Sequence, residues 1–172
     1  SSRPASGSEH HLSHFFEIVG IVKEEPYFSH GIDVAYSAVV TAKIREELLK
    51  REFPTVQYTP ERSFYENKMH KVYGKVGEGC IALQDKLGTY KADRVSIYKA
   101  KEKEIREILA EMPSSKEIED MLALVELDAN ELYSFYGEEK VNNAILYAKD
   151  LKDRYTVLWM QYDLFGGEYE NR

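Results

Sequence analysis

Apolar residues recur at spacings of three and four along almost the whole chain, and this pattern constrains the fold more than any other feature. The clearest case is a predicted helix from about residue 138 to 164, in which the repeating residues are Val141, Ile145, Ala148, Leu151, Tyr155 and Leu158. Such spacing places side chains on one face of an α-helix, and the strict alternation of a half-buried strand is almost absent. The sequence therefore predicts an all-α domain with short loops.

Prolines, glycines and capping residues divide the rest of the chain into further helices. We expect them at residues 8 to about 20, 32 to 53, 61 to 87 with a break between 74 and 79, 91 to 112, 116 to 126, and 129 to 136. Ser6 or Ser8 is expected to cap the first helix, in which Glu9 suits the first turn. The turn at Pro113 to Ser115 is expected to cap the helix that follows it.

The composition suits one domain that spans residues 1–172. The chain has 172 residues, of which 43% are hydrophobic, and this is enough for one sizeable core. Its 23 Lys and Arg against 30 Asp and Glu give a net charge of -7. This charge argues against binding to nucleic acid or to an anionic membrane surface, since both depend on positive potential. A small anionic substrate remains possible, because a local pocket can differ in sign from the whole.

Cysteine usage and hydropathy indicate the cellular compartment expected for this chain. Cys80 is the single cysteine, which excludes an intrachain disulfide and favours the reducing cytoplasm. We expect it to be a buried small apolar residue. No apolar run approaches the length that crosses a bilayer, and no signal-peptide pattern is present.

Three of the five histidines fall within five residues, at His10, His11 and His14. On a helix His10 and His14 project from the same face, whereas His11 is rotated by about 100° from His10. His30 lies farther along, where a loop meets the start of the most apolar predicted helix. Neutral imidazole is the commonest metal ligand, so His10 and His30 are candidates for one divalent metal.

Such a metal site needs a further ligand and an open position for water or substrate. Glu9 and Asp33 are the nearest carboxylates in the sequence, although Asp33 is equally suited to capping its helix. The alternative is that the histidine cluster is a coincidence on a solvated turn. We expect His70 to have no functional role, the Lys and Glu residues from Lys99 to Glu111 to form a solvated face, and the aromatic residues from Tyr133 to Tyr136 to belong to a core or an interface.

Three segments carry a resemblance to a known family. The stretches SRPASGSEHHLSH and SHGIDVAYSAV are similar to the metal-binding segment of the glycerol-1-phosphate dehydrogenases, within the superfamily of iron-containing alcohol dehydrogenases, glycerol dehydrogenases and dehydroquinate synthases. The tail AKDLKDRYTVLWMQYDLFG resembles the closing helix of that family. The similarity runs from residue 2 to about residue 166. It implies a helical, metal-binding C-terminal domain of a two-domain, dehydroquinate synthase-like fold.

The resemblance also implies roles for particular residues. The first His of the family's H-x-x-x-H motif and the His of its HG motif are metal ligands, and they correspond to His10 and His30. The metal is zinc in many members and nickel or iron in others. The second His of the first motif, His14, would face the substrate and act on a hydroxyl or a proton. The loop Ser6, Gly7 and Ser8 precedes the histidines at a helix N-terminus, which suits a hydroxyl or phosphate group.

The implied reaction is hydride transfer from NAD(P)H to dihydroxyacetone phosphate, giving sn-glycerol 1-phosphate. The family's third metal ligand, an aspartate, and its nucleotide-binding half both lie upstream of the matching segment. The resemblance therefore implies that NAD or NADP is bound mainly by that upstream half and not by these 172 residues. We therefore interpret the sequence as the metal- and substrate-binding half of a dehydrogenase, which could form homo-oligomers through its exposed apolar face.

Two other classes of function remain open. A metal-dependent hydrolase could use the same histidines, but it would need a His-Asp pair or more carboxylates, and no His-Asp dipeptide occurs. A helical interaction domain without catalysis would tolerate replacement of His10, His14 and His30. A degenerate fragment of a dehydrogenase, also without catalysis, is the other alternative.

Overall fold

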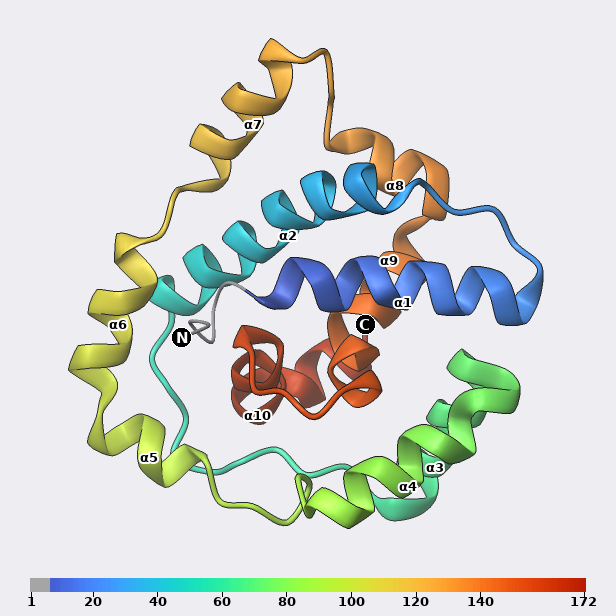
Figure 1. Ribbon diagram of the computed structural model, residues 1–172. Coiled ribbons are helices and arrows are strands. Elements are labelled where there is room, and N and C mark those ends of the chain that lie inside the picture. Colours follow the sequence, from blue (N-terminus) through green and yellow to red (C-terminus); the bar gives the residue numbers. More distant parts are fainter. Residues whose placement is uncertain (1–6) are drawn as a thin grey trace.

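Every regular element of residues 7–172, the part of the chain that the computed structural model describes, is a helix (Figure 1). The α-helices are α1 (Ser8–Lys23), α2 (His30–Lys50), α3 (Arg62–Tyr73), α4 (Gly77–Leu87), α5 (Val95–Ala100), α6 (Glu102–Glu111), α7 (Ser115–Leu124), α8 (Asn130–Tyr136), α9 (Glu138–Tyr147) and α10 (Val157–Glu170). Two short 3-10 helices, η2 (Gly74–Val76) and η3 (Ala148–Leu151), follow α3 and α9. The predicted all-α fold class is confirmed.

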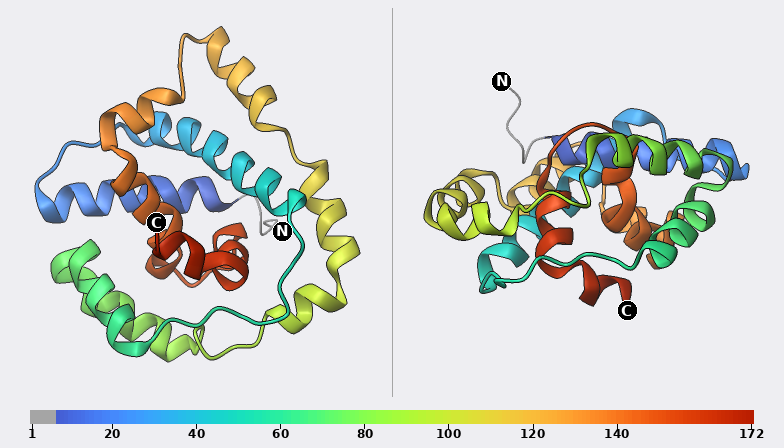
Figure 2. Two further views of the ribbon diagram at one scale, coloured as in Figure 1. Left: turned by 180° about the vertical axis from the view of Figure 1, so that it is seen from behind. Right: turned by 90° about the horizontal axis from the view of Figure 1, so that it is seen from below.

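The other helices surround α10, the last helix of the chain (Figure 1). α1 and α2 form an antiparallel pair on one side, and α3 and α4 lie on the opposite side. α5 and α6 follow the edge between these pairs, and the view from behind shows the same enclosure (Figure 2). The C-terminal segment is therefore central to the fold, and the helices that precede it shield it from solvent.

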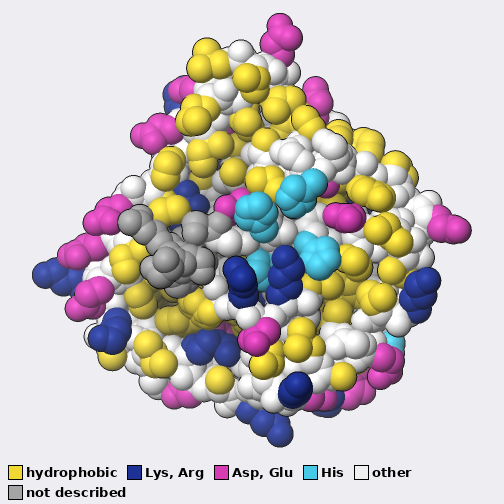
Figure 3. Space-filling model, viewed as in Figure 1, with side chains coloured by type: hydrophobic (Ala, Val, Ile, Leu, Met, Phe, Trp, Pro, Cys, Tyr) yellow, Lys and Arg dark blue, Asp and Glu magenta, His cyan; other side chains and the backbone are white. Residues whose placement is uncertain are grey.

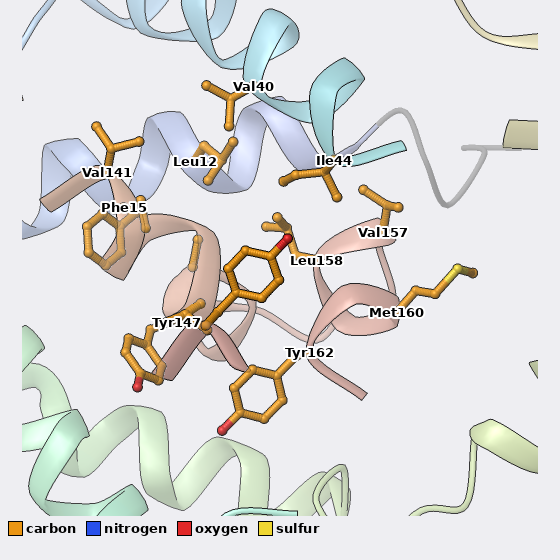
Figure 4. Close-up of a cluster of buried hydrophobic side chains, with 14 of the residues drawn as sticks. Leu12, Phe15, Val40, Ile44, Val141, Tyr147, Val157, Leu158, Met160 and Tyr162 are labelled. Carbon is orange, nitrogen blue, oxygen red and sulfur yellow. The ribbon is translucent and has the colours of Figure 1, made fainter. Parts of the chain in front are cut away.

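The hydrophobic core lies where α1, α2, α9 and α10 meet (Figure 4). Leu12 and Phe15 of α1 face this core together with side chains of the three other helices, including Val40, Ile44, Val141, Tyr147, Leu158 and Tyr162. On α1 the buried apolar positions are Leu12, Phe15, Phe16 and Val19, the spacing of one helix face. The remaining face of α1, which carries His10 and His14, is consequently turned away from the core.

The single long helix that we predicted from residue 138 to 164 is wrong, because the chain breaks between α9 and α10. After η3 the backbone becomes extended at Lys152, and Thr156 begins α10 by accepting a hydrogen bond from the amide of Leu158. The apolar spacing continues through the break, since both helices bury a face in the same core. Periodicity alone therefore could not reveal the interruption.

A buried ion pair occupies this break. Lys149 and Asp150 are both fully buried, and the Lys149 ammonium donates hydrogen bonds to the Asp150 carboxylate at 2.9 Å and to the carbonyl of Leu146 at 2.7 Å. The ammonium lies 3.6 Å from the centre of the Tyr162 ring and 4.9 Å from that of Trp159. Cation–π contacts and hydrogen bonds compensate in part for the desolvation of the charge, which lowers the pKa of Lys149.

The first helix differs from the expectation at both ends. Its N-cap is Gly7, with no side-chain cap, so Ser8 is the first helical residue rather than a cap; Ser6 lies outside the described residues. The helix passes through Gly20 and ends at Lys23, where Glu24 takes a left-handed conformation with φ of 56°. Gly20 is thus not a stop signal, and its role comes from the packing of the next loop.

The other boundaries follow the predictions closely. The break between residues 74 and 79 is confirmed by η2, and the predicted helix over 91–112 is divided into α5 and α6 at Lys101. Ser114 caps α7 through a reciprocal capping box with Glu117, as expected from the turn after Pro113. Local signals were sufficient at these boundaries, in contrast to those of α1.

No helix among residues 7–172 is both long enough and apolar enough to traverse a lipid bilayer.

Candidate functional site

Two of the candidate ligands, His10 and His30, come together although twenty positions separate them in the sequence. His10 lies in the first turn of α1, and His30 is the first residue of α2. Their ring centroids are 5.7 Å apart and their planes are inclined by 31°. Both side chains are exposed. The antiparallel pairing of α1 and α2 therefore builds a site with two adjacent imidazoles at the surface.

Ser13 orients one of these rings. Its hydroxyl oxygen lies 3.0 Å from Nδ1 of His30 and shares a hydrogen bond with it, and the Ser13 side chain is itself buried. With Nδ1 engaged, the other ring nitrogen of His30 is left to face solvent and a ligand. Metal-binding histidines commonly have a second partner of this kind, which holds the ring and selects its tautomer. Sequence reasoning missed Ser13, although its position three residues after His10 was a usable signal.

His14 and His11 lie on the same helix but are more enclosed. His14 is half-buried, and its Nδ1 has no hydrogen-bond partner among the described residues. Burial lowers its pKa, and the nearby charge of Lys152 acts in the same direction. His11 is buried, with Nδ1 2.9 Å from the carbonyl oxygen of Gly7. Burial, rather than a charged partner, is also the main cause of its lowered pKa.

The carboxylates nearest in sequence do not complete a metal site. Asp33 is buried and accepts hydrogen bonds from the hydroxyl of Tyr136. Glu9 is half-buried, and burial raises its pKa while His10 and Arg45 oppose this shift. Within residues 7–172 no three His, Cys, Asp or Glu side chains converge on one point.

The residues present nevertheless fit part of a metal site. Two imidazoles that share one tetrahedral ion, each about 2.0–2.1 Å from it through nitrogen, hold their rings at a separation close to the one observed between His10 and His30. Ser13 supplies the outer hydrogen bond that such ligands require. The pair can thus provide two ligands, and a complete site needs at least one more from elsewhere.

The predicted substrate loop is described only in part. Gly7 is half-buried and Ser8 is fully buried, and the Ser8 hydroxyl has no hydrogen-bond partner within the described residues. Ser6 belongs to the undescribed start of the chain. The start of α1 therefore contains buried polar atoms directly beside the histidines.

Basic side chains adjoin the histidines on the surface of the molecule (Figure 3). The charge of Lys152 acts on both His11 and His14, and that of Arg154 acts on His11. Both belong to the loop between η3 and α10. The helix predicted from residue 138 to 164 included both residues, so the sequence did not indicate that they lie in a loop beside α1.

The remaining candidates have structural roles. His70 is exposed and pairs with Glu78 at 3.0 Å, and Cys80 is buried in the core. On α6, Glu102 and Arg106 form one of the expected ion pairs, but both are half-buried and Arg106 also donates a hydrogen bond to the carbonyl of Arg51, so this part of the predicted face is not fully solvated. Tyr136 is buried, whereas the half-exposed Phe135 stacks on Phe28.

The fold and site define an all-helical domain that presents paired histidines beside a basic loop, and comparisons with known proteins give this description a more specific context. The chain is 27% identical over 175 residues to glycerol-1-phosphate dehydrogenase [NAD(P)+] of Bacillus licheniformis, covering 96% of this chain and 31% of that protein. A second similarity, 49% identity over 39 residues, is to glycerol-1-phosphate dehydrogenase [NAD(P)+] of Bacillus subtilis and covers 23% of this chain and 10% of that protein.

The similarity is thus to part of longer proteins. The chain spans about a third of the length of the Bacillus licheniformis protein, and neither a family model nor a solved structure matches it. The comparisons support the family resemblance derived from the histidine motifs.

Proposed function

We propose that this chain forms the metal- and substrate-binding part of an NAD(P)-linked oxidoreductase that reduces dihydroxyacetone phosphate to sn-glycerol 1-phosphate. The observation that carries the proposal is the close approach of His10 and His30, with Ser13 orienting the second ring. The similarity to two glycerol-1-phosphate dehydrogenases supports the choice of reaction.

His10 and His30 would hold a divalent metal, zinc in preference to nickel or iron. When bound, such an ion acts as a Lewis acid on the ketone or alcohol oxygen of the substrate. His14 lies one turn after His10 on the same face of α1, so it can hydrogen-bond a substrate hydroxyl or pass a proton to it. NAD or NADP would be bound by a part of the enzyme outside these residues, and the buried single cysteine is in keeping with a cytoplasmic protein.

The metal content of the purified chain tests this proposal. The comparison is between the natural sequence, the double variant His10→Ala/His30→Ala, and His70→Ala. His70 provides a matched control, because it is an exposed histidine on α3 whose one ion pair within residues 7–172 is with Glu78. Because the described residues supply only two ligands, the metal is added in excess before the analysis, and we expect zinc, nickel or iron to be retained by the natural chain and by His70→Ala and lost from the double variant.

Equal metal content in the double variant and the natural chain would exclude His10 and His30 as ligands. Absence of metal from all three proteins would mean that the two histidines hold no ion without a further ligand. A helical interaction domain without catalysis would then be favoured if a longer chain that supplies this ligand also bound no metal.

A further inference from the structure

The loop of residues 152–155, which joins η3 to α10, brings two cations to the histidine face. Lys152 and Arg154 have no hydrogen-bond or ion-pair partner for their side chains among residues 7–172, even though the chain as a whole carries a net charge of -7. Their charges act on His11 and His14, and Figure 3 shows basic side chains beside the histidines. Asp153 lies between them in the sequence and is exposed, but no ion pair joins it to either cation within the described residues. Two neighbouring cations that are not engaged in ion pairs can bind an anion.

The backbone of this loop is anchored at both ends. The side-chain amide of Gln84 is buried and donates hydrogen bonds to the carbonyl oxygens of Asp150 at 3.0 Å and Lys152 at 3.4 Å. At the other end Thr156 caps α10 and lies against the start of α1, since a Cβ on Gly7 would be 3.7 Å from its methyl group. The two cations therefore project from a backbone whose position is set by the fold.

Buried polar atoms without partners occur on the adjoining turns of α1. Ser8 is 0% exposed and His11 is 2% exposed, yet within the described residues the Ser8 hydroxyl and Nε2 of His11 make no hydrogen bond. Nδ1 of His11 is engaged by the Gly7 carbonyl, so its other nitrogen remains for a further partner. Buried polar groups are nearly always satisfied by protein, water or ligand, and these atoms adjoin the cations that act on the same imidazole.

We propose that Lys152 and Arg154 form a binding subsite for the phosphate group of a small phosphorylated substrate. The assignment of the phosphate to a substrate rests on the proposed function, which places the carbon to be reduced at His10 and His30. The phosphate would lie toward the start of α1, where Ser8 and His11 offer hydrogen-bonding atoms. A guanidinium and an ammonium bind phosphate through charge-assisted hydrogen bonds, which are stronger than those of neutral groups. The carboxylate of Glu17 also acts on His14, but Glu17 is three residues farther along α1 and so lies farther from the start of the helix, where the phosphate is proposed to bind.

Calorimetric titration of the 172-residue chain with inorganic phosphate tests the subsite. The chain is first treated with a chelator, so that binding does not depend on a metal. The test variant is Lys152→Gln/Arg154→Gln, and the matched control is Lys75→Gln/Lys103→Gln, which removes the same positive charge from two exposed lysines on other surfaces. We expect the affinity for phosphate to fall by about tenfold or more in the test variant and by less than about twofold in the control.

Three outcomes separate this inference from the proposed function. Phosphate binding that is lost only in Lys152→Gln/Arg154→Gln supports the subsite. This holds even if the metal analysis shows that His10 and His30 bind no metal. An equal loss in the test and control variants would overturn it, because the effect would then come from net charge. Failure of the natural chain to bind phosphate would overturn it as well, while metal binding at His10 and His30 would stand.

Discussion

Asp33 shows how its surroundings change the chemistry of a single side chain. It lies in the first turn of α2, is 1% exposed, and accepts hydrogen bonds from the Tyr136 hydroxyl at 2.8 and 3.0 Å. Burial raises the pKa of this carboxyl to about 7, although the hydrogen bond from Tyr136 opposes the shift. A group expected to cap a helix or bind a metal is therefore a largely neutral component of the core at mildly acidic pH.

This shift predicts a pH-dependent stability. Between the ordinary pKa of 3.8 and about 7, the folded chain keeps the Asp33 proton while the unfolded chain releases it, so stability falls as the pH rises through this range. We expect Asp33→Asn, compared with the natural chain, to gain roughly 1–3 kcal/mol in the free energy of unfolding between pH 5 and pH 8. Urea unfolding at the two pH values measures this gain. Asp120→Asn, at an exposed position of α7, is the control; an equal change in both variants would contradict the assignment.

At the scale of elements, Gly20 shows that close packing between a helix and a loop can require glycine at a position where helix propensity disfavours it. A Cβ at this position would lie 2.4 Å from Cδ1 of Tyr27 and 2.9 Å from the carbonyl oxygen of Glu25. The loop after α1 therefore folds back directly onto the helix at Gly20. This return places α2 beside α1 and carries His30 to its position next to His10.

A pair of glycine substitutions tests this interpretation. Gly20→Ala is expected to destabilise the chain by roughly 1–3 kcal/mol, because the backbone of the loop must move. Gly79 lies within α4, and a Cβ added there would meet no atom within 4 Å, so Gly79→Ala is expected to stabilise by about 0.5–1 kcal/mol. Chemical unfolding of both variants provides the comparison. Stabilisation by both substitutions would show that the contact with the loop is unimportant.

At the scale of the whole molecule, the candidate site depends on the assembly of three separate segments. His10 and His14 come from α1, His30 from α2, and Lys152 with Arg154 from the loop before α10. Since α10 lies at the centre of the helices, the basic loop reaches α1 only when the entire domain has folded (Figure 1). Binding at the site should therefore be coupled to global stability.

Zinc is accordingly expected to raise the Tm of the natural chain. At a hundredfold excess over Kd, binding to the folded state alone adds about 2.7 kcal/mol, which corresponds to roughly 5–10 °C for a chain of this size. His14→Ala should retain this increase, because His14 is assigned to the substrate, and His10→Ala/His30→Ala should lose it. Thermal denaturation followed by circular dichroism measures the shift. A shift that persists in the double variant would place zinc elsewhere.

The sequence by itself determined the fold class, most helix boundaries and the shared face of His10 and His14. These features depend on interactions between residues within four positions of each other, such as the capping box of Ser114 and the apolar spacing on α1. The sequence also identified His30 as a candidate metal ligand.

Only the tertiary structure decided how these parts meet. The interruption between α9 and α10 depends on the burial of Lys149 and Asp150 against tyrosines from other elements, and the contact of Ser13 with His30 depends on the return of the chain at Gly20. Lys152 and Arg154 lie beside the histidines because the interruption between α9 and α10 places them in a loop next to α1. Contacts between segments distant in sequence leave no periodic signal, because their free energy arises only when the core has assembled.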